Sequence, residues 1–201
     1  MCSSDLVLRA QLAGIDAART GVKYEAVHDA ARRVLTEGLV DLKLLPRGVA
    51  DSLAMHHYRE FYMHGTGHWL GMDVHDVGDY RMHGASRALE PGMVFTVEPG
   101  LYVDPERESV TYSLREYSEE EQWERRYRLG IAAAKKLEED EKAKAPKITH
   151  PVPKEFRGIG VRIEDDVLIT AAGREILTAG TPKTVDEVER ACAETSRLPR
   201  P

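Results

Sequence analysis

The sequence predicts an α+β fold, because helical patterns near the N-terminus give way to strand patterns further along the chain. Residues 6–20 are rich in Leu, Ala and Arg, and residues 22–38 repeat apolar side chains on one helical face. Residues 93–97 combine branched and aromatic side chains, and residues 158–170 alternate apolar side chains with polar or small ones before continuing as strand. We therefore expect two early helices and two strands of one sheet that are distant in sequence.

The length and composition are those of a globular protein with one sizeable core. The 201 residues are 42% hydrophobic and 31% charged, which is ordinary for a globular chain. A net charge of −6 without a basic stripe argues against a nucleic-acid partner. The lack of a long apolar run and of a secretory signal argues against a membrane partner. Cys2 and Cys192 have neither disulfide nor metal spacing, which fits a cytoplasmic protein.

The first six residues do not resemble a natural N-terminus. Met-Cys-Ser-Ser-Asp-Leu is the translation of a common sequencing-adapter end read from an alternative start codon. Such segments are excluded from reasoning about the fold. We expect residues 1–6 to be an assembly artefact and the gene to begin upstream.

A highly charged segment separates the two predicted strands. Between Asp104 and Lys147, 12 residues are acidic and 10 are basic, which is half of that stretch. Acid–base pairs spaced four residues apart, with the acid first, are typical of a solvated helix. Four such pairs occur: Glu121–Arg125, Glu124–Arg128, Glu138–Lys142 and Asp140–Lys144. We expect a mostly exposed helical insert over residues 104–153 that serves as a spacer, with a partner-binding arm as the alternative.

Residues 63–78, MHGTGHWLGMDVHDVG, gather three histidines and four glycines. Each glycine would cost about 1 kcal/mol relative to alanine in a helix interior. His64 and His68 have the spacing of the helical zinc-protease motif, but Gly-Thr-Gly lies between them. The segment is therefore predicted to be an extended loop or strand whose side chains converge on a common site.

His68, Glu98 and Glu164 are the candidate metal ligands. Glu98 directly follows the strand pattern at 93–97, and Glu164 follows Ile163. A carboxylate in an apolar strand is costly unless something neutralises it. One imidazole and two carboxylates suit a divalent cation such as Mn, Fe, Co or Zn. For either glutamate alone, an ordinary surface carboxylate is the alternative, and the combination with the histidine segment favours a metal.

Three further residues are candidates for the chemistry around such a metal. His64 and His75 flank His68, and neutral imidazoles can donate to a developing oxyanion or move protons near neutral pH. Arg162 lies two residues before Glu164 on the same strand face and is expected to orient that carboxylate. We expect the other five histidines to be structural: His28, His56, His57, His83 and His150.

Three segments together resemble a known family: HGTGHWLGMDVHD at 64–76, LEPGMVFTVEPG at 89–100 and RGIGVRIEDD at 157–166. They resemble the C-terminal catalytic domain of the Xaa-Pro aminopeptidases (aminopeptidase P), in the superfamily of creatinase, prolidase and methionine aminopeptidase. The resemblance runs from residue 7 to 190, apart from the charged insert. It implies an incomplete pita-bread fold, an antiparallel sheet with flanking helices, and makes residues 7–201 the C-terminal portion of a catalytic metallopeptidase domain.

The resemblance implies hydrolysis of the bond between an N-terminal residue and a following proline, with two divalent cations. Mn²⁺ is the expected metal, with Co²⁺ or Zn²⁺ as alternatives. By position, His68, Glu98 and Glu164 match the family's metal ligands, with Glu164 bridging both cations. His64 and His75 match its substrate-contacting histidines, and Glu98 is also implied in handling the proton of the nucleophilic water. The implied partner is a peptide with proline second, and a homo-oligomer of the full-length protein stays open.

One departure from the family pattern affects activity. The family uses five metal ligands, two of them aspartates on an upstream strand pair, and residues 1–63 offer no aspartate in that context. We therefore expect the chain to be an incomplete enzyme that is inactive by itself. Two alternatives stay open: an Xaa-Pro dipeptidase (prolidase), and a non-catalytic pita-bread module that binds peptides or proteins.

Overall fold

The computed structural model describes residues 3–117 and 119–194, so Met1 and Cys2 lie outside the described residues. The chain divides into two compact units. The first unit comprises residues 1–35, 64–102 and 159–201, and the second comprises residues 36–63 and 103–158. All the candidate site residues belong to the first unit.

The strands of the first unit pair in antiparallel fashion, as the resemblance implied. β10 (Asp165–Thr170) lies between β5 (Val94–Val97) and β11 (Gly173–Ile176), and β6 (Gly100–Tyr102) pairs with β9 (Gly160–Arg162). One short hairpin lies within the histidine segment, β1 (Leu70–Gly71) with β2 (Val74–His75), and a second follows it, β3 (Arg81–Met82) with β4 (Ala85–Ser86). The predicted strands at 93–97 and 158–170 therefore lie side by side.

The predicted strand at 158–170 is divided into β9 and β10 at Ile163 and Glu164. The neighbouring strand segment is divided at the same level, between β5 and β6, where Pro99 has no N–H to donate to a ladder. Val97 pairs with Asp165 on one side of this break, and Gly100 pairs with Arg162 on the other. Because both pairs share one register, Glu98 stands opposite Glu164.

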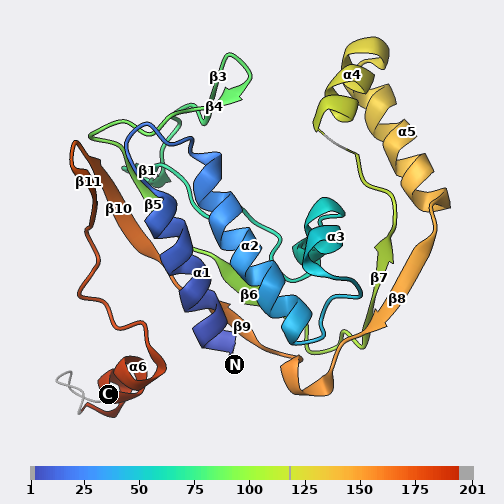
Figure 1. The fold of residues 1–201 in the computed structure, drawn as a ribbon. Coiled ribbons are helices and arrows are strands. Elements are labelled where there is room, and N and C mark those ends of the chain that lie inside the picture. The colour runs from blue at the N-terminus through green and yellow to red at the C-terminus, as the bar shows by residue number, and fades with distance from the viewer. Residues whose placement is uncertain (1–2, 118, 195–201) are drawn as a thin grey trace. The chain divides into compact units, whose positions relative to one another are not determined.

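Helix α1 (Ser3–Ala17) begins three residues before the predicted start and packs on strands β5, β6 and β9 (Figure 1). Its buried residues recur three and four positions apart, which places them on one face. Helix α2 (Glu25–Asp41) contributes Val27 to the same core. This core consists of buried side chains from both helices and the sheet: Ile15, Ala18, Val27, Trp69, Leu89, Phe95, Val97, Val167 and Ile169.

A last helix, α6 (Val185–Ala193), ends the described part of the first unit. Thr184 caps its N-terminus: the Thr184 side chain accepts from the Glu187 N–H, and the Glu187 carboxylate accepts from the Thr184 N–H. The apolar side chains Val185 and Val188 of α6 are exposed. No described residue of α6 is buried.

The second unit contains the charged insert, whose ends differ from the prediction. Two exposed helices form as expected, α4 (Glu119–Leu129) and α5 (Ile131–Lys144), but they are carried by an antiparallel pair that was not predicted, β7 (Ser109–Ser113) and β8 (Lys147–Pro151) (Figure 1). β7 alternates exposed and buried side chains, and its sequence SVTYS alternates polar and apolar residues, so the strand signal was present. The remaining elements of this unit are α3 (Val49–Ala54) and the 3₁₀ turns η1 (His57–Glu60) and η2 (Lys154–Phe156).

The charged side chains of the insert form ion pairs near the Tyr117 ring more than they form pairs within each helix. Glu124 and Arg128 form one predicted pair, at 3.1 Å. Arg125 instead contacts Glu141 at 3.0 Å, and its guanidinium lies 4.4 Å from the centre of the buried Tyr117 ring. Contacts between the two helices thus replace some of the expected local pairs, because an aromatic face and a carboxylate together hold an arginine better than an exposed neighbour does.

Within the described residues, no helix is long and apolar enough to cross a membrane.

The histidine segment is not helical, as predicted, and its first part, residues 66–69, runs alongside β5. The Thr96 N–H donates to the His68 carbonyl at 2.9 Å, and the Glu98 N–H donates to the Thr66 carbonyl at 2.6 Å. Gly67 lies between these bonds, where a Cβ atom would overlap the Thr96 carbonyl oxygen and lie 2.8 Å from its carbon. Only glycine allows the two backbones to approach this closely.

We predict that Gly67→Ala destabilises the fold by about 1–3 kcal/mol, the usual cost of overpacking, because the new methyl group must push the segment off β5. Urea unfolding of the metal-free chain measures the change. The matched control is Gly180→Ala, since a Cβ at Gly180 meets nothing within 4 Å. Equal stability of the two variants would contradict the predicted close approach.

Candidate metal centre

Three predicted ligands converge from three separate segments of the first unit. His68 lies on the extended segment before β1, Glu98 in the break between β5 and β6, and Glu164 in the break between β9 and β10. One ligand atom from each lies within 4.8 Å of the others. The prediction that His68 is close to both carboxylates is confirmed, and the spacing is small enough for one cation to bind all three after minor side-chain adjustment.

The backbone fixes which nitrogen of His68 is available as a ligand. Nδ1 lies 3.0 Å from the Trp69 carbonyl oxygen, which can only accept a hydrogen bond. Nδ1 therefore carries the proton, which leaves Nε2, 3.4 Å from Glu98 Oε1, as the nitrogen that can bind a cation. This is the usual arrangement of a metal-binding histidine, in which a backbone carbonyl sets the tautomer and the ring orientation.

Glu98 is buried and held at both oxygens. The Thr96 hydroxyl donates to Oε1 at 3.0 Å, and Arg162 Nη1 donates to Oε2 at 3.1 Å. Thr96 itself is fixed, because its Oγ1 accepts from the His68 N–H at 3.0 Å. A single threonine therefore connects the backbone of one candidate ligand to the carboxylate of another.

Glu164 is the most exposed of the three candidates, but its carboxyl group is not in an ordinary environment. Partial desolvation and the nearby carboxylates of Glu98 and Asp166 raise the pKa of Glu164 above its usual value. Like charges placed opposite each other across two strands are destabilising unless they are neutralised. A divalent cation between Glu98 and Glu164 would remove that repulsion, so the donor set fits a metal of mixed nitrogen and oxygen preference.

All the residues predicted for the site surround one open cavity of about 390 Å³. The lining includes His64, His68, His75, Glu98, Arg162 and Glu164. The exposed His75 ring lies 4.1 Å from the His68 ring, centre to centre. Val74, directly before it, has a φ of 63°, which costs a non-glycine residue about 1–3 kcal/mol and is typical of functional sites.

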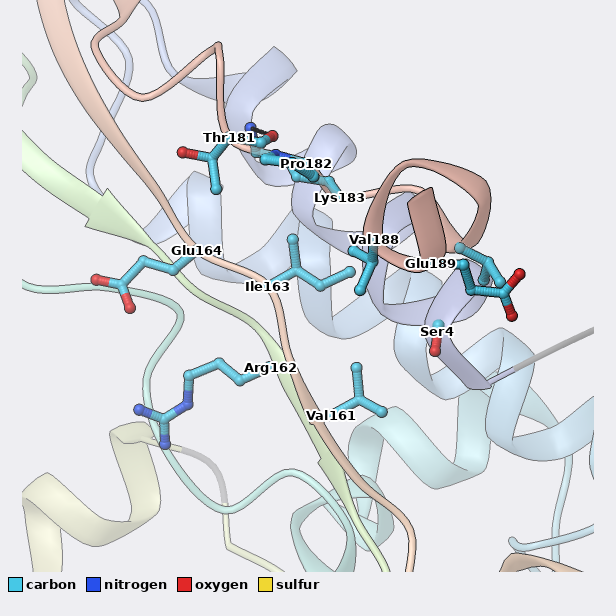
Figure 2. Close-up of a pocket in the computed structure, with 11 residues that line it drawn as sticks. Ser4, Val161, Arg162, Ile163, Glu164, Thr181, Pro182, Lys183, Val188 and Glu189 are labelled. Atoms are coloured by element: carbon cyan, nitrogen blue, oxygen red, sulfur yellow. Dashed lines mark hydrogen bonds between the residues drawn. The ribbon is translucent and has the colours of Figure 1, made fainter. Parts of the chain in front are cut away.

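Arg162 was expected to orient Glu164, but its hydrogen bonds go to other groups. Nη1 binds Glu98 and Nε donates to the Tyr102 hydroxyl at 2.7 Å. Arg162 is opposite Gly100 and thus diagonal to Glu98 across the strand pair, which explains why its guanidinium binds Glu98. Figure 2 shows Arg162 and Glu164 on one side of the strand, with Val161 and Ile163 on the other, as the predicted alternation requires.

Tyr102 is a site residue that the sequence reasoning missed. Its hydroxyl accepts from Arg162 and lies 3.0 Å from His64 Nε2, while His64 Nδ1 lies 2.7 Å from the Gly65 carbonyl. Nδ1–H donates to the Gly65 carbonyl, which leaves Nε2 without a proton, so the phenol donates to Nε2. Tyr102 shares the strand face of Glu98 and Gly100, and the missing side chain at Gly100 leaves room for its ring. Alternation from Glu98 was the signal that could have identified it.

Thr96 was also missed, although the signal was present. It is a buried polar residue in an otherwise apolar strand, and such a group needs a hydrogen-bond partner. Among the histidines expected to be structural, His28 lies 2.8 Å from the Thr66 hydroxyl and His57 is buried against Tyr112. Neither lines the cavity.

Known proteins share both the sequence and the fold of this chain. Residues 3–171 match the model of metallopeptidase family M24. Xaa-Pro aminopeptidase 1 of Streptomyces coelicolor is 42% identical over 186 residues, which cover 92% of this chain and 29% of the relative. Human Xaa-Pro dipeptidase is 35% identical over 203 residues, covering 94% and 35%. The chain thus spans about a third of the length of the curated relatives it matches.

Solved structures give the same result. The aminopeptidase PepP of Pseudomonas aeruginosa superposes with a TM-score of 0.69 at 41% identity, over 94% of this chain and 33% of that one. Zn-substituted Escherichia coli aminopeptidase P in complex with product superposes with a TM-score of 0.69 at 35% identity, over 96% of this chain and 34% of that one. The predicted pita-bread fold is confirmed over the part that the chain covers. With a family match that extends over most of its length, the chain belongs to metallopeptidase family M24.

Proposed function

We propose that this chain supplies His68, Glu98 and Glu164 to the divalent-cation centre of an Xaa-Pro aminopeptidase. The observation that carries the proposal is the convergence of one ligand atom from each residue within 4.8 Å. The tautomer of His68 and the crowding of the two carboxylates both support it. The proposed substrate is a peptide with proline at its second position, in keeping with the aminopeptidase relatives.

The chemistry divides between the cations and the side chains around them. Divalent cations acidify water and polarise carbonyl groups when bound. Glu98 would take up and return the proton of the attacking water, since its carboxylate faces the cavity beside His68. The exposed His75 would donate a hydrogen bond to the oxygen of the scissile carbonyl. His64 would contact the substrate from the side of the cavity braced by Tyr102.

The metal we propose is Mn²⁺, with Co²⁺ or Zn²⁺ as alternatives, and Glu164 would help to hold it together with His68 and Glu98. One imidazole and two carboxylates form a mixed donor set that suits all three ions. A Zn-substituted relative shows that the related Escherichia coli protein accepts zinc. Competition between these three ions for the chain would identify the ion that it prefers.

The two competing functions receive less support. A dipeptidase relative is 35% identical, against 42% for an aminopeptidase, and nothing in the cavity of the described residues favours the dipeptidase. A pure binding module has no need of three converging ligands, a fixed histidine tautomer and a buried carboxylate held at both oxygens. We therefore place the chain with the aminopeptidases.

We predict that Glu164→Gln weakens cation binding by the metal-free chain at least about tenfold, which corresponds to about 1.4 kcal/mol. The amide keeps the size of the side chain and removes the charge that the cation neutralises. Isothermal titration with Mn²⁺ and Zn²⁺ measures the affinity. Glu175→Gln, which changes an exposed glutamate of β11, is the control and should bind like the unchanged chain. Equal affinity of both variants would exclude Glu164 as a ligand.

We also predict that the 201-residue chain alone has no useful peptidase activity after loading with Mn²⁺. Its described residues bring together three ligand side chains, and the family resemblance implies five for two cations. Loss of a single electrostatic contact to a transition state typically costs about 2.7–4 kcal/mol, or a hundred- to a thousandfold in rate. Release of the first residue from an Xaa-Pro-Yaa peptide is the assay. Turnover of about 1 s⁻¹ or faster, an ordinary enzymatic rate, would show that three ligands suffice.

A further inference from the structure

The residue after Glu164 is a buried carboxylate with three partners. Asp165 is 2% exposed. Its Oδ2 accepts a hydrogen bond from Gln11 Nε2 of α1, and its Oδ1 accepts from the Thr178 hydroxyl at 2.6 Å and lies 3.0 Å from Lys183 Nζ. Such a charge is tolerated in an interior only when it is paired and hydrogen-bonded. Lys183 supplies the opposite charge.

Lys183 is directed at Asp165 by its surroundings. Its side chain is 13% exposed. Besides Asp165, its ammonium donates to the Thr178 carbonyl at 3.2 Å and to the Thr181 carbonyl at 3.0 Å. An ammonium has three donors, and these three acceptors use them all. The Lys183 backbone N–H also donates to Glu187 at 3.2 Å, which connects it to the capped start of α6. The pair is thus a fixed contact between β10 and the segment that follows β11.

We propose that Lys183 is a positioning residue for Glu164, acting through Asp165; the proposal rests on the metal role proposed above. Adjacent residues in an extended chain point to opposite faces. Asp165 points to the face covered by α1 and Lys183, and Glu164 points to the face that carries the metal cavity. Fixing the Asp165 side chain therefore also fixes the direction of the Glu164 side chain. Figure 2 shows Glu164 pointing away from the side on which Lys183 and Val188 lie.

Apolar packing alone does not hold this segment. A cavity of about 380 Å³ lies beside it, lined by Val161, Ile163, Pro182 and Val188 among others. The side chains of α6 therefore do not fill the space behind Ile163. The polar contacts of Asp165 supply the constraint that packing would otherwise provide. A further hydrogen bond joins the same two segments, since the Asp166 N–H donates to the Thr178 hydroxyl at 3.0 Å.

The positioning contact comes from residues beyond the end of the match to the family model. The family match ends at residue 171, whereas Thr178 and Lys183 lie beyond it. The segment after β11 therefore contacts the strand that begins directly after the proposed metal ligand. It determines the position of a ligand that the family motif supplies.

The test uses the full 201-residue chain and four variants. Lys183→Met removes the charge and keeps the stem, and Lys183→Arg keeps the charge. The double change Lys183→Met with Asp165→Asn removes both charges, and rotation of the Gln11 amide lets its unpaired Oε1 accept from the new Asn. Lys23→Met is the control, since Lys23 is an exposed lysine of the same unit. Circular dichroism verifies that each variant is folded.

The first measurement is amide hydrogen exchange without metal. We expect the Asp166 amide to exchange at least about tenfold faster in Lys183→Met, because the segment opens locally. The Ile169 amide, which donates to Met93 within the sheet at 2.9 Å, should keep its rate. Arginine at 183 and the double variant should restore protection at Asp166. An unchanged Asp166 rate in Lys183→Met, or an equal rise at Ile169, overturns the proposal.

The second measurement is the visible absorption of bound Co²⁺, which reports on ligand geometry and which a purely structural role would leave unchanged. Lys183→Met should weaken Co²⁺ binding at least about tenfold and alter the spectrum, and Lys183→Arg should restore both. An unchanged spectrum and affinity overturn the positioning role. If the unchanged chain binds no Co²⁺, the metal proposal fails, and the exchange result alone then decides whether Lys183 fixes the segment.

Discussion

Two carboxylates that face each other across an antiparallel strand pair are the constraint on which the site depends. The register that joins Val97 to Asp165 and Gly100 to Arg162 leaves Glu98 and Glu164 opposite one another. Their side chains lie close, because opposite residues have Cβ atoms about 4.5–5.5 Å apart. Without a cation they repel, and the pKa of Glu164 is raised first by desolvation and further by the charge of Glu98. The contacts around them are arranged to hold this unfavourable pair in place.

Each of those contacts has a separate physical origin. Gly67 lets the histidine segment run against β5, which brings His68 to the carboxylates. Arg162 reaches diagonally to Glu98, and Tyr102 holds the guanidinium in that position. On the other face of the strand, Asp165 is fixed by side chains from α1 and from the segment that follows β11. The fold therefore fixes both faces of the strand pair that presents the two carboxylates.

Much of this could be predicted from the sequence, for reasons that differ between elements. The extended form of the histidine segment follows from its glycines, and the strand at 93–97 from its branched side chains. The six site residues followed from their chemistry and from the family resemblance, and the structure gathers them around one cavity. The partner of Arg162 could not be predicted, because it depends on a register between strands about 60 residues apart. The strands β7 and β8 were missed because the helical charge pattern was extended over the whole segment, although β7 (SVTYS) alternates polar and apolar residues.

The central claim is that His68, Glu98 and Glu164 bind one divalent cation together. Crystals of the chain grown with Mn²⁺, with diffraction data collected at the manganese absorption edge, test it most directly. We predict an anomalous peak about 2.0–2.2 Å from His68 Nε2 and from a carboxylate oxygen of each glutamate, the range of ordinary ligand bonds. A peak elsewhere with none between these three side chains, or manganese bound without Glu164, would contradict it.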